Sequence, residues 1–146
     1  MNRHFAALLS LPVLVLSAST PARADEVDNA PGSMCVGAGA TLLVAGEIGD
    51  GLYLLLRGRC TPFHVDAGGR ELPLALLREG DVFGEISLLL DKPVTATVRA
   101  DVTSVVLKLG RPAFERLSST QPELRASLMR MATERLENTA RLLARG

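Results

Sequence analysis

The chain has 146 residues, of which 47% are hydrophobic and only 3% aromatic, with no tryptophan. This length is enough for one domain with a substantial core, which leucine, valine and alanine must largely build. Sixteen basic residues balance sixteen acidic ones, so no overall electrostatic field favours nucleic acid or an anionic membrane, and any binding must come from a local site.

Residues 1–24 differ in character from the rest of the chain. A basic start at Arg3 precedes an apolar run over residues 5–16, and an alanine-arginine-alanine tripeptide stands at residues 22–24. This pattern predicts a secretory signal peptide, because the run is too short and too broken by proline for a stable membrane span. Cleavage would make the protein periplasmic or secreted, and otherwise it would be cytoplasmic. A mis-assigned start, or the stub of a longer protein, is the alternative.

Residues 25–33 are acidic, contain a proline-glycine pair and show no apolar period, which predicts a linker. Two cysteines follow, Cys35 and Cys60. In an oxidising compartment they permit one disulfide, and two ordinary thiols are the alternative. Their spacing is not that of a metal site and the chain has only two histidines, so we expect no metal ligation.

Short β-type runs separated by glycine turns follow. They cover residues 41–44, 52–56, 61–65 and 72–77. Pro62 favours the edge of a sheet for the third run, because proline cannot donate a ladder hydrogen bond. Residues 66–70 predict a hairpin loop between the third run and the fourth.

The stretch over residues 79–100 combines a turn, a helix and a strand. A turn is expected at residues 79–81, a helical run at residues 83–90 and a break at residues 91–93. Beyond the break, apolar and polar residues alternate, and residues 105–109 repeat this pattern, so both segments are predicted strands. Short strands at regular intervals with glycine turns predict a jelly-roll-like barrel.

After Gly110 the apolar period becomes helical. A short helix is predicted over residues 113–117 and a longer one from Pro122 to about Leu143. The longer helix has a narrow apolar stripe, marginal for a coiled coil. The stripe consists of Met129, Ala132, Leu136, Thr139 and Leu143. This helix either packs on its own barrel or offers a homodimer surface, and the sequence leaves both open.

The whole stretch from Phe83 to Ala100 resembles the phosphate-binding cassette of cyclic nucleotide-binding domains, the sensor domains of Crp/Fnr-like proteins. Phe-Gly-Glu, a Leu-Leu pair, a proline and Ala-Thr-Val follow in the family's order and spacing without gaps. The resemblance implies a mainly β domain over residues 34–146. A double-stranded β-helix, or β-roll, would span about residues 34–110, and a short and a longer α-helix would span about residues 111–144.

The same resemblance implies a ligand site. The residues that it identifies are Phe83, Gly84, Glu85, Ile86, Thr95 and Ala96. Glu85 would take the ribose 2′-hydroxyl, while Thr95 and Ala96 would line the phosphate end. Cyclic AMP or cyclic GMP is the candidate ligand, and no cofactor is implied. The alternative gives Gly84 only a turn and Glu85 only an interaction with the helix dipole.

One position departs from the family pattern. Val94 stands where the family usually has the arginine that pairs with the cyclic phosphate. Losing one partner of a buried ion pair costs about 3–5 kcal/mol, or roughly two to three and a half decades in affinity. Lys92 and Arg99 are the candidate compensating charges. However, Pro93 restricts the direction of Lys92, and Arg99 lies on the opposite strand face from Val94.

The expected function is therefore a non-enzymatic, small-molecule-sensing regulatory module with weakened or altered ligand specificity. A ligand-independent β-roll that acts as a scaffold or dimerisation unit is the alternative. Catalysis is disfavoured, because His64 stands alone in a strand and Glu85 has no evident carboxylate partner. No helix-turn-helix unit follows the long helix, so we expect no direct DNA binding.

Overall fold

The computed structural model describes residues 32–145. The predicted signal peptide at residues 1–24 and most of the predicted linker at residues 25–33 lie outside this part of the chain. Ser33, which the sequence assigns to the linker, is already the first residue of strand β1.

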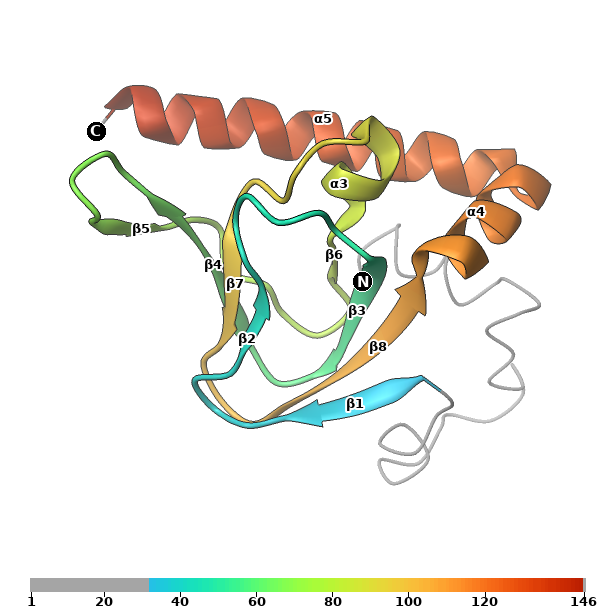
Figure 1. Ribbon diagram of the computed structural model, residues 1–146, viewed down its shortest axis with the longest axis horizontal. Helices are drawn as coiled ribbons and strands as arrows, with labels where there is room; N and C mark the ends of the chain where they lie inside the picture. The colour runs from blue at the N-terminus through green and yellow to red at the C-terminus, as the bar shows by residue number, and fades with distance from the viewer. Residues whose placement is uncertain (1–31, 146) are drawn as a thin grey trace.

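The described residues form two four-stranded antiparallel sheets and three helices (Figure 1). One sheet has, in spatial order, β1 (Ser33–Val36), β8 (Ser104–Gly110), β3 (Gly51–Arg57) and β6 (Val82–Phe83). The other has β2 (Thr41–Leu43), β7 (Thr97–Ala100), β4 (Cys60–Val65) and β5 (Glu71–Pro73). The helices are α3 (Glu85–Leu90), α4 (Arg111–Thr120) and α5 (Pro122–Arg145). This confirms the predicted β-roll followed by a short and a longer helix.

Strand β3 is buried on both faces. Leu52 and Leu54 belong to a hydrophobic cluster that the three helices cover, whereas Tyr53 and Leu55 belong to a second cluster between the two sheets. Side chains alternate between the faces of a strand, so a strand with a core on each side needs an unbroken apolar run. The leucine-rich sequence of β3 therefore joins the roll to its helices.

Helix α5 packs on its own roll through its first half. Its buried residues are Leu124, Leu128, Met131 and Ala132, and all four join the cluster beneath the helices. The predicted stripe is therefore partly wrong: Ala132 is buried, but Leu136 and Leu143 are only half-buried. The reason is that the second half of α5 runs past the core and over the end of the roll, beside the β4–β5 hairpin (Figure 1).

Strand β4 lies inside its sheet, so the edge position predicted from Pro62 is wrong. Its neighbours are β7, at residues 60–63, and β5, at residues 63–65. The carbonyl of Pro62 accepts a hydrogen bond from the Leu74 backbone N–H at 2.8 Å, just past the end of β5. The amide and carbonyl of one residue in an antiparallel strand face the same neighbour, so the position where Pro62 lacks an N–H also faces this irregular segment. The strand predicted at residues 72–77 has already ended there, since β5 stops at Pro73.

Gly84 makes the sharp turn from β6 into α3. Its φ is +85°, and a Cβ at this position would lie 2.8 Å from the carbonyl oxygen of Gly51 and 3.3 Å from the Tyr53 ring. A side chain here would therefore strain the backbone and overlap neighbouring atoms. The turn that delivers Glu85 to the start of α3 requires glycine.

Gly84→Ala is expected to lower the free energy of unfolding by about 2–4 kcal/mol, since left-handed strain adds to steric overlap. Gly69→Ala is the matched control, because Gly69 has φ +80° but nothing within 4 Å of the added Cβ. This control should lose only about 1–2 kcal/mol from strain. Urea denaturation measures both, and equal losses would mean that the Gly51 carbonyl moves aside at no cost.

Candidate functional site

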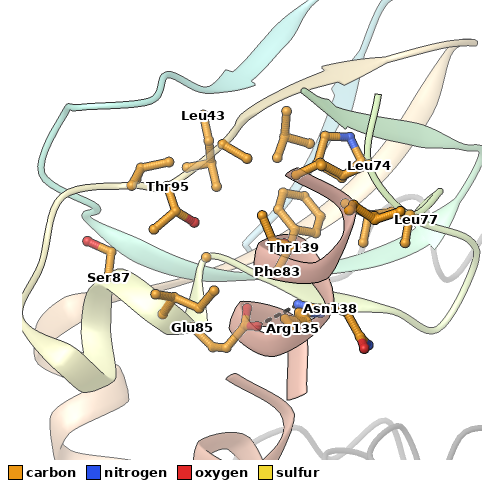
Figure 2. Close-up of a pocket in the computed structure, with 18 residues that line it drawn as sticks. Leu43, Leu74, Leu77, Phe83, Glu85, Ser87, Thr95, Arg135, Asn138 and Thr139 are labelled. Carbon is orange, nitrogen blue, oxygen red and sulfur yellow. Dashed lines mark hydrogen bonds and ion pairs between the residues drawn. The ribbon is translucent and has the colours of Figure 1, made fainter. Parts of the chain in front are cut away.

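A cavity of about 140 Å³ lies at the end of the roll, beneath the second half of α5. Its walls come from β6, the start of α3, the segment leading into β7, the segment after β5, and α5 itself. Most of these side chains are apolar. Figure 2 shows Leu43 and Leu74 on one side of the cavity, with Glu85 and Arg135 on the other.

The six residues that the sequence predicts to bind a ligand all line this cavity. They come from two segments: residues 83–86, at the end of β6 and the start of α3, and residues 95–96, beyond the end of α3. Val94 lines the cavity as well, with only 8% of its surface exposed. The structure therefore brings together every residue of the predicted site, including the position where the family arginine is absent.

Ser87 holds the two segments in place. Its hydroxyl donates to the Lys92 carbonyl at 2.6 Å and accepts from the Gly49 backbone N–H at 2.9 Å. Nearby, the Val94 N–H donates to the Glu47 carbonyl at 2.8 Å, and the Val94 carbonyl accepts from the Gly46 N–H at 2.9 Å. These bonds fix the wall around Val94 to the loop between β2 and β3.

The charged group of the predicted site, Glu85, is buried and paired. Only 1% of its surface is exposed, and its Oε1 accepts a hydrogen bond from Nη1 of Arg135 at 2.6 Å (Figure 2). Glu85 and Arg135 are the only charged side chains among the eighteen that line the cavity. The lining thus carries one compensated pair and no net charge.

Sequence reasoning missed Arg135 as part of the site. Arg135, Asn138 and Thr139 all line the cavity, and their spacing of three and four residues places them on one face of α5. Thr139 belongs to the predicted apolar stripe. A polar residue in that stripe was the signal in the sequence that this face of α5 lines a site. The pairing of Arg135 with Glu85, fifty residues earlier, left no local pattern.

Neither candidate compensating charge lines the cavity. Lys92 is exposed. Arg99 forms an ion pair with Glu71 at 2.9 Å and lies over the ring of Phe63 at 5.0 Å. The hydrogen bond to Glu71 raises the pKa of Arg99, and the same bond lowers the pKa of Glu71. Arg99 thus serves an exposed cluster on the sheet.

Cys35 and Cys60 are free thiols in the structure, so the permitted disulfide is not formed. Cys35 is exposed on β1 and Cys60 is buried on β4, and these strands belong to different sheets. Burial raises the pKa of the Cys60 thiol. Within residues 32–145, no group of three or more His, Cys, Asp or Glu side chains is placed to hold a metal. No helix of this described part is long and apolar enough to cross a membrane.

Residues 34–121 match the family model of the cyclic nucleotide-binding domain. A similar curated protein, the cAMP-dependent protein kinase regulatory subunit of Aspergillus fumigatus, is 38% identical over 105 residues. The match covers 72% of this chain and 25% of that protein. The chain therefore spans only about a quarter of the length of these regulatory subunits.

Two solved structures resemble the fold. The catabolite activator protein of Thermus thermophilus superposes with a TM-score of 0.66 and 30% identity, over 77% of this chain and 52% of that one. The regulatory subunit of a cAMP-independent protein kinase A from Trypanosoma brucei superposes with a TM-score of 0.62 and 25% identity. That match covers 70% of this chain and 36% of that one.

Arg135→Ala is expected to lower the free energy of unfolding by about 2–3 kcal/mol, because it leaves the buried Glu85 carboxylate without its partner. Glu85→Ala should lose only about 1 kcal/mol, because the Arg135 side chain is 30% exposed and its guanidinium can turn to solvent. Urea denaturation of the two variants measures this asymmetry.

Arg141→Ala is the matched control, since Arg141 lies on the same helix and pairs with Glu137 on the surface, both more than half exposed. It should change the free energy of unfolding by no more than about 0.5 kcal/mol. Equal losses for Arg135→Ala and Arg141→Ala would contradict a stabilising role for the buried pair.

Proposed function

Because the chain belongs to the cyclic nucleotide-binding domain family, we propose that it is a small-molecule-sensing regulatory module whose ligand occupies the cavity beneath α5. The observation that carries this proposal is the placement of Glu85. Its carboxylate is buried at the cavity and its partner comes from the helix that covers the cavity. A ligand that bonds to Glu85 therefore acts directly on the contact between the roll and α5.

The cavity offers complementary chemistry to a ribose with an attached ring. The carboxylate of Glu85 is a strong acceptor for hydroxyl groups. Apolar walls, with Leu43, Leu74 and Phe83 among them, suit the faces of a base. From above, Asn138 and Thr139 of α5 supply polar groups for the edge of that base. The candidate ligands are cyclic AMP, cyclic GMP and related purine ribosides.

Ligand binding would be transmitted through α5. A ligand shifts a helix only if it binds one arrangement better than the other. Here a ligand hydroxyl adds a second partner to the carboxylate that Arg135 already binds, while the base contacts the next turn of the same helix. The position of α5 thus depends on the occupancy of the cavity, which is the property required of a sensor.

The similar proteins support a regulatory role, but they do not identify the ligand of this cavity. They include a cAMP-dependent and a cAMP-independent protein kinase regulatory subunit. A sensing domain of this fold is therefore not tied to cyclic AMP in every protein. The identity of the ligand must come from the residues that line the cavity of this chain.

A panel of adenosine, guanosine, cyclic AMP and cyclic GMP should contain a ligand that raises the melting temperature of the full chain, because binding to the folded state alone stabilises it. The 2′-deoxy analogue of that ligand should bind about 10–100 times more weakly, since it loses a hydrogen bond to a charged acceptor. Calorimetry measures both affinities.

In Glu85→Ala the riboside and its 2′-deoxy analogue should bind equally well. This double comparison separates contact with Glu85 from an effect on folding. No melting shift with any of the four compounds at millimolar concentration would contradict the proposed function.

A second candidate, a ligand-independent dimerisation unit, is favoured by one observation. Leu136 and Leu143 lie one heptad apart on α5, are half-buried and belong to neither core cluster. Apolar residues at heptad spacing are typical of a helix seam between two copies.

For this second function, sedimentation equilibrium should find a dimer both with and without the four compounds. Leu136→Asn should shift it to monomer, while Ala140→Asn, on an exposed position of the same helix, should not. A monomer at every concentration would exclude this function.

A further inference from the structure

The lining of the cavity holds no spare positive charge. Arg135 is the only cationic side chain among the eighteen lining residues, and it is already bound to Glu85 at 2.6 Å. A cyclic nucleotide would bring one negative charge into a lining whose own charges cancel. In a partly desolvated site this charge loses hydration without gaining a counter-charge.

The wall around Val94 carries no charged side chain. Val94 is 8% exposed and packs in the cluster between the sheets with Leu43 and Val98. Behind it, a Cβ at Gly49 would lie 3.5 Å from a methyl group of Val94 and 2.6 Å from Ser87. The Ser87 hydroxyl is committed to two backbone groups. This wall therefore presents carbon where an anionic oxygen would need a cation.

Lys92, two residues before Val94, is exposed and does not line the cavity, and three other cations are engaged elsewhere. Arg111 donates to the Gly49 carbonyl at 3.0 Å and lies 3.8 Å from Asp91. Arg99 binds Glu71, and Lys108 binds Asp50 at 2.5 Å. None of these three lines the cavity. Recruiting one would break an existing pair and require the side chain to enter an apolar site.

Recruiting Arg135 would also carry a cost. A phosphate that took the guanidinium would leave Glu85, 1% exposed, as a buried charge with a ligand hydroxyl as its remaining partner. A neutral ligand avoids this loss, because a hydroxyl can bond to the carboxylate while the ion pair stays in place. A carboxylate has about four lone-pair sites for such donors.

From these contacts we propose that the cavity selects an uncharged purine nucleoside over the corresponding cyclic nucleotide. The inference rests on the proposed function, in which Glu85 bonds to a ribose hydroxyl, and it names the class of ligand.

The test is a calorimetric titration of the full chain with adenosine and cyclic AMP, and with guanosine and cyclic GMP. We expect the nucleoside of the preferred base to bind at least 10-fold tighter than its cyclic nucleotide. A cyclic nucleotide that binds as tightly as its nucleoside, or tighter, would overturn the inference and leave the proposed function standing. No binding by any of the four at millimolar concentration would overturn both.

A charge added to the wall should reverse the preference. Thr95→Lys introduces a cation at an exposed position that lines the cavity, so the core is not disturbed. Thr95→Gln, a neutral side chain of similar length at the same position, is the reference for this change. The ratio of cyclic nucleotide affinity to nucleoside affinity should be at least 10-fold higher in Thr95→Lys than in Thr95→Gln.

Val94→Arg restores the family's cation directly and should give the same reversal where circular dichroism shows that the variant folds. If Val94→Arg does not fold, the wild-type titration and Thr95→Lys still test the inference. A wild-type preference for the nucleoside that neither cation reduces would overturn charge as its cause.

Discussion

A carboxylate that folding removes from water needs a partner, and the partner of Glu85 comes from α5, fifty residues later in the chain. This ion pair joins the roll to the second half of its long helix, beyond the part held by apolar packing. The first half of α5 is fixed by Leu124 and Leu128 in the core. The second half has no side chain among the buried residues of the helix, so the ion pair is its main polar attachment to the roll.

Two constraints place Glu85 at this point. Gly84 turns the chain through a conformation with φ +85° against the Gly51 carbonyl, so that α3 starts beside β3. Strand β3 has apolar residues on both faces, and it therefore holds the roll on one side and the helices on the other. The site lies at the junction of the two core clusters.

The electrostatics of the cavity follow from the same pair. Since Arg135 compensates Glu85 and Val94 contributes only carbon, the lining offers hydrogen bonds and apolar contact rather than charge. An arginine at position 94 would change that balance, because it would hold an anion without disturbing Glu85. In the proposed function, the valine therefore alters the kind of ligand that fits. A ligand in that function acts through α5, and this action does not require the ligand to be charged.

The local sequence alone determined much of the fold and the positions of the predicted site residues. Alternation in the strands, glycine turns and the change to a helical period after Gly110 identified the roll and its helices. One ungapped stretch around Gly84 predicted six site residues, and all six line the cavity. These features are readable because each depends on neighbours within a few residues. Tertiary structure decided the interior position of β4, the buried face of α5 and the partner of Glu85. Each of these depends on which distant segment lies alongside, and neither a hydrophobic period nor a proline carries that information. Arg135 is the clearest case. Only folding brings this arginine of α5 to the buried carboxylate of Glu85 as its counter-charge.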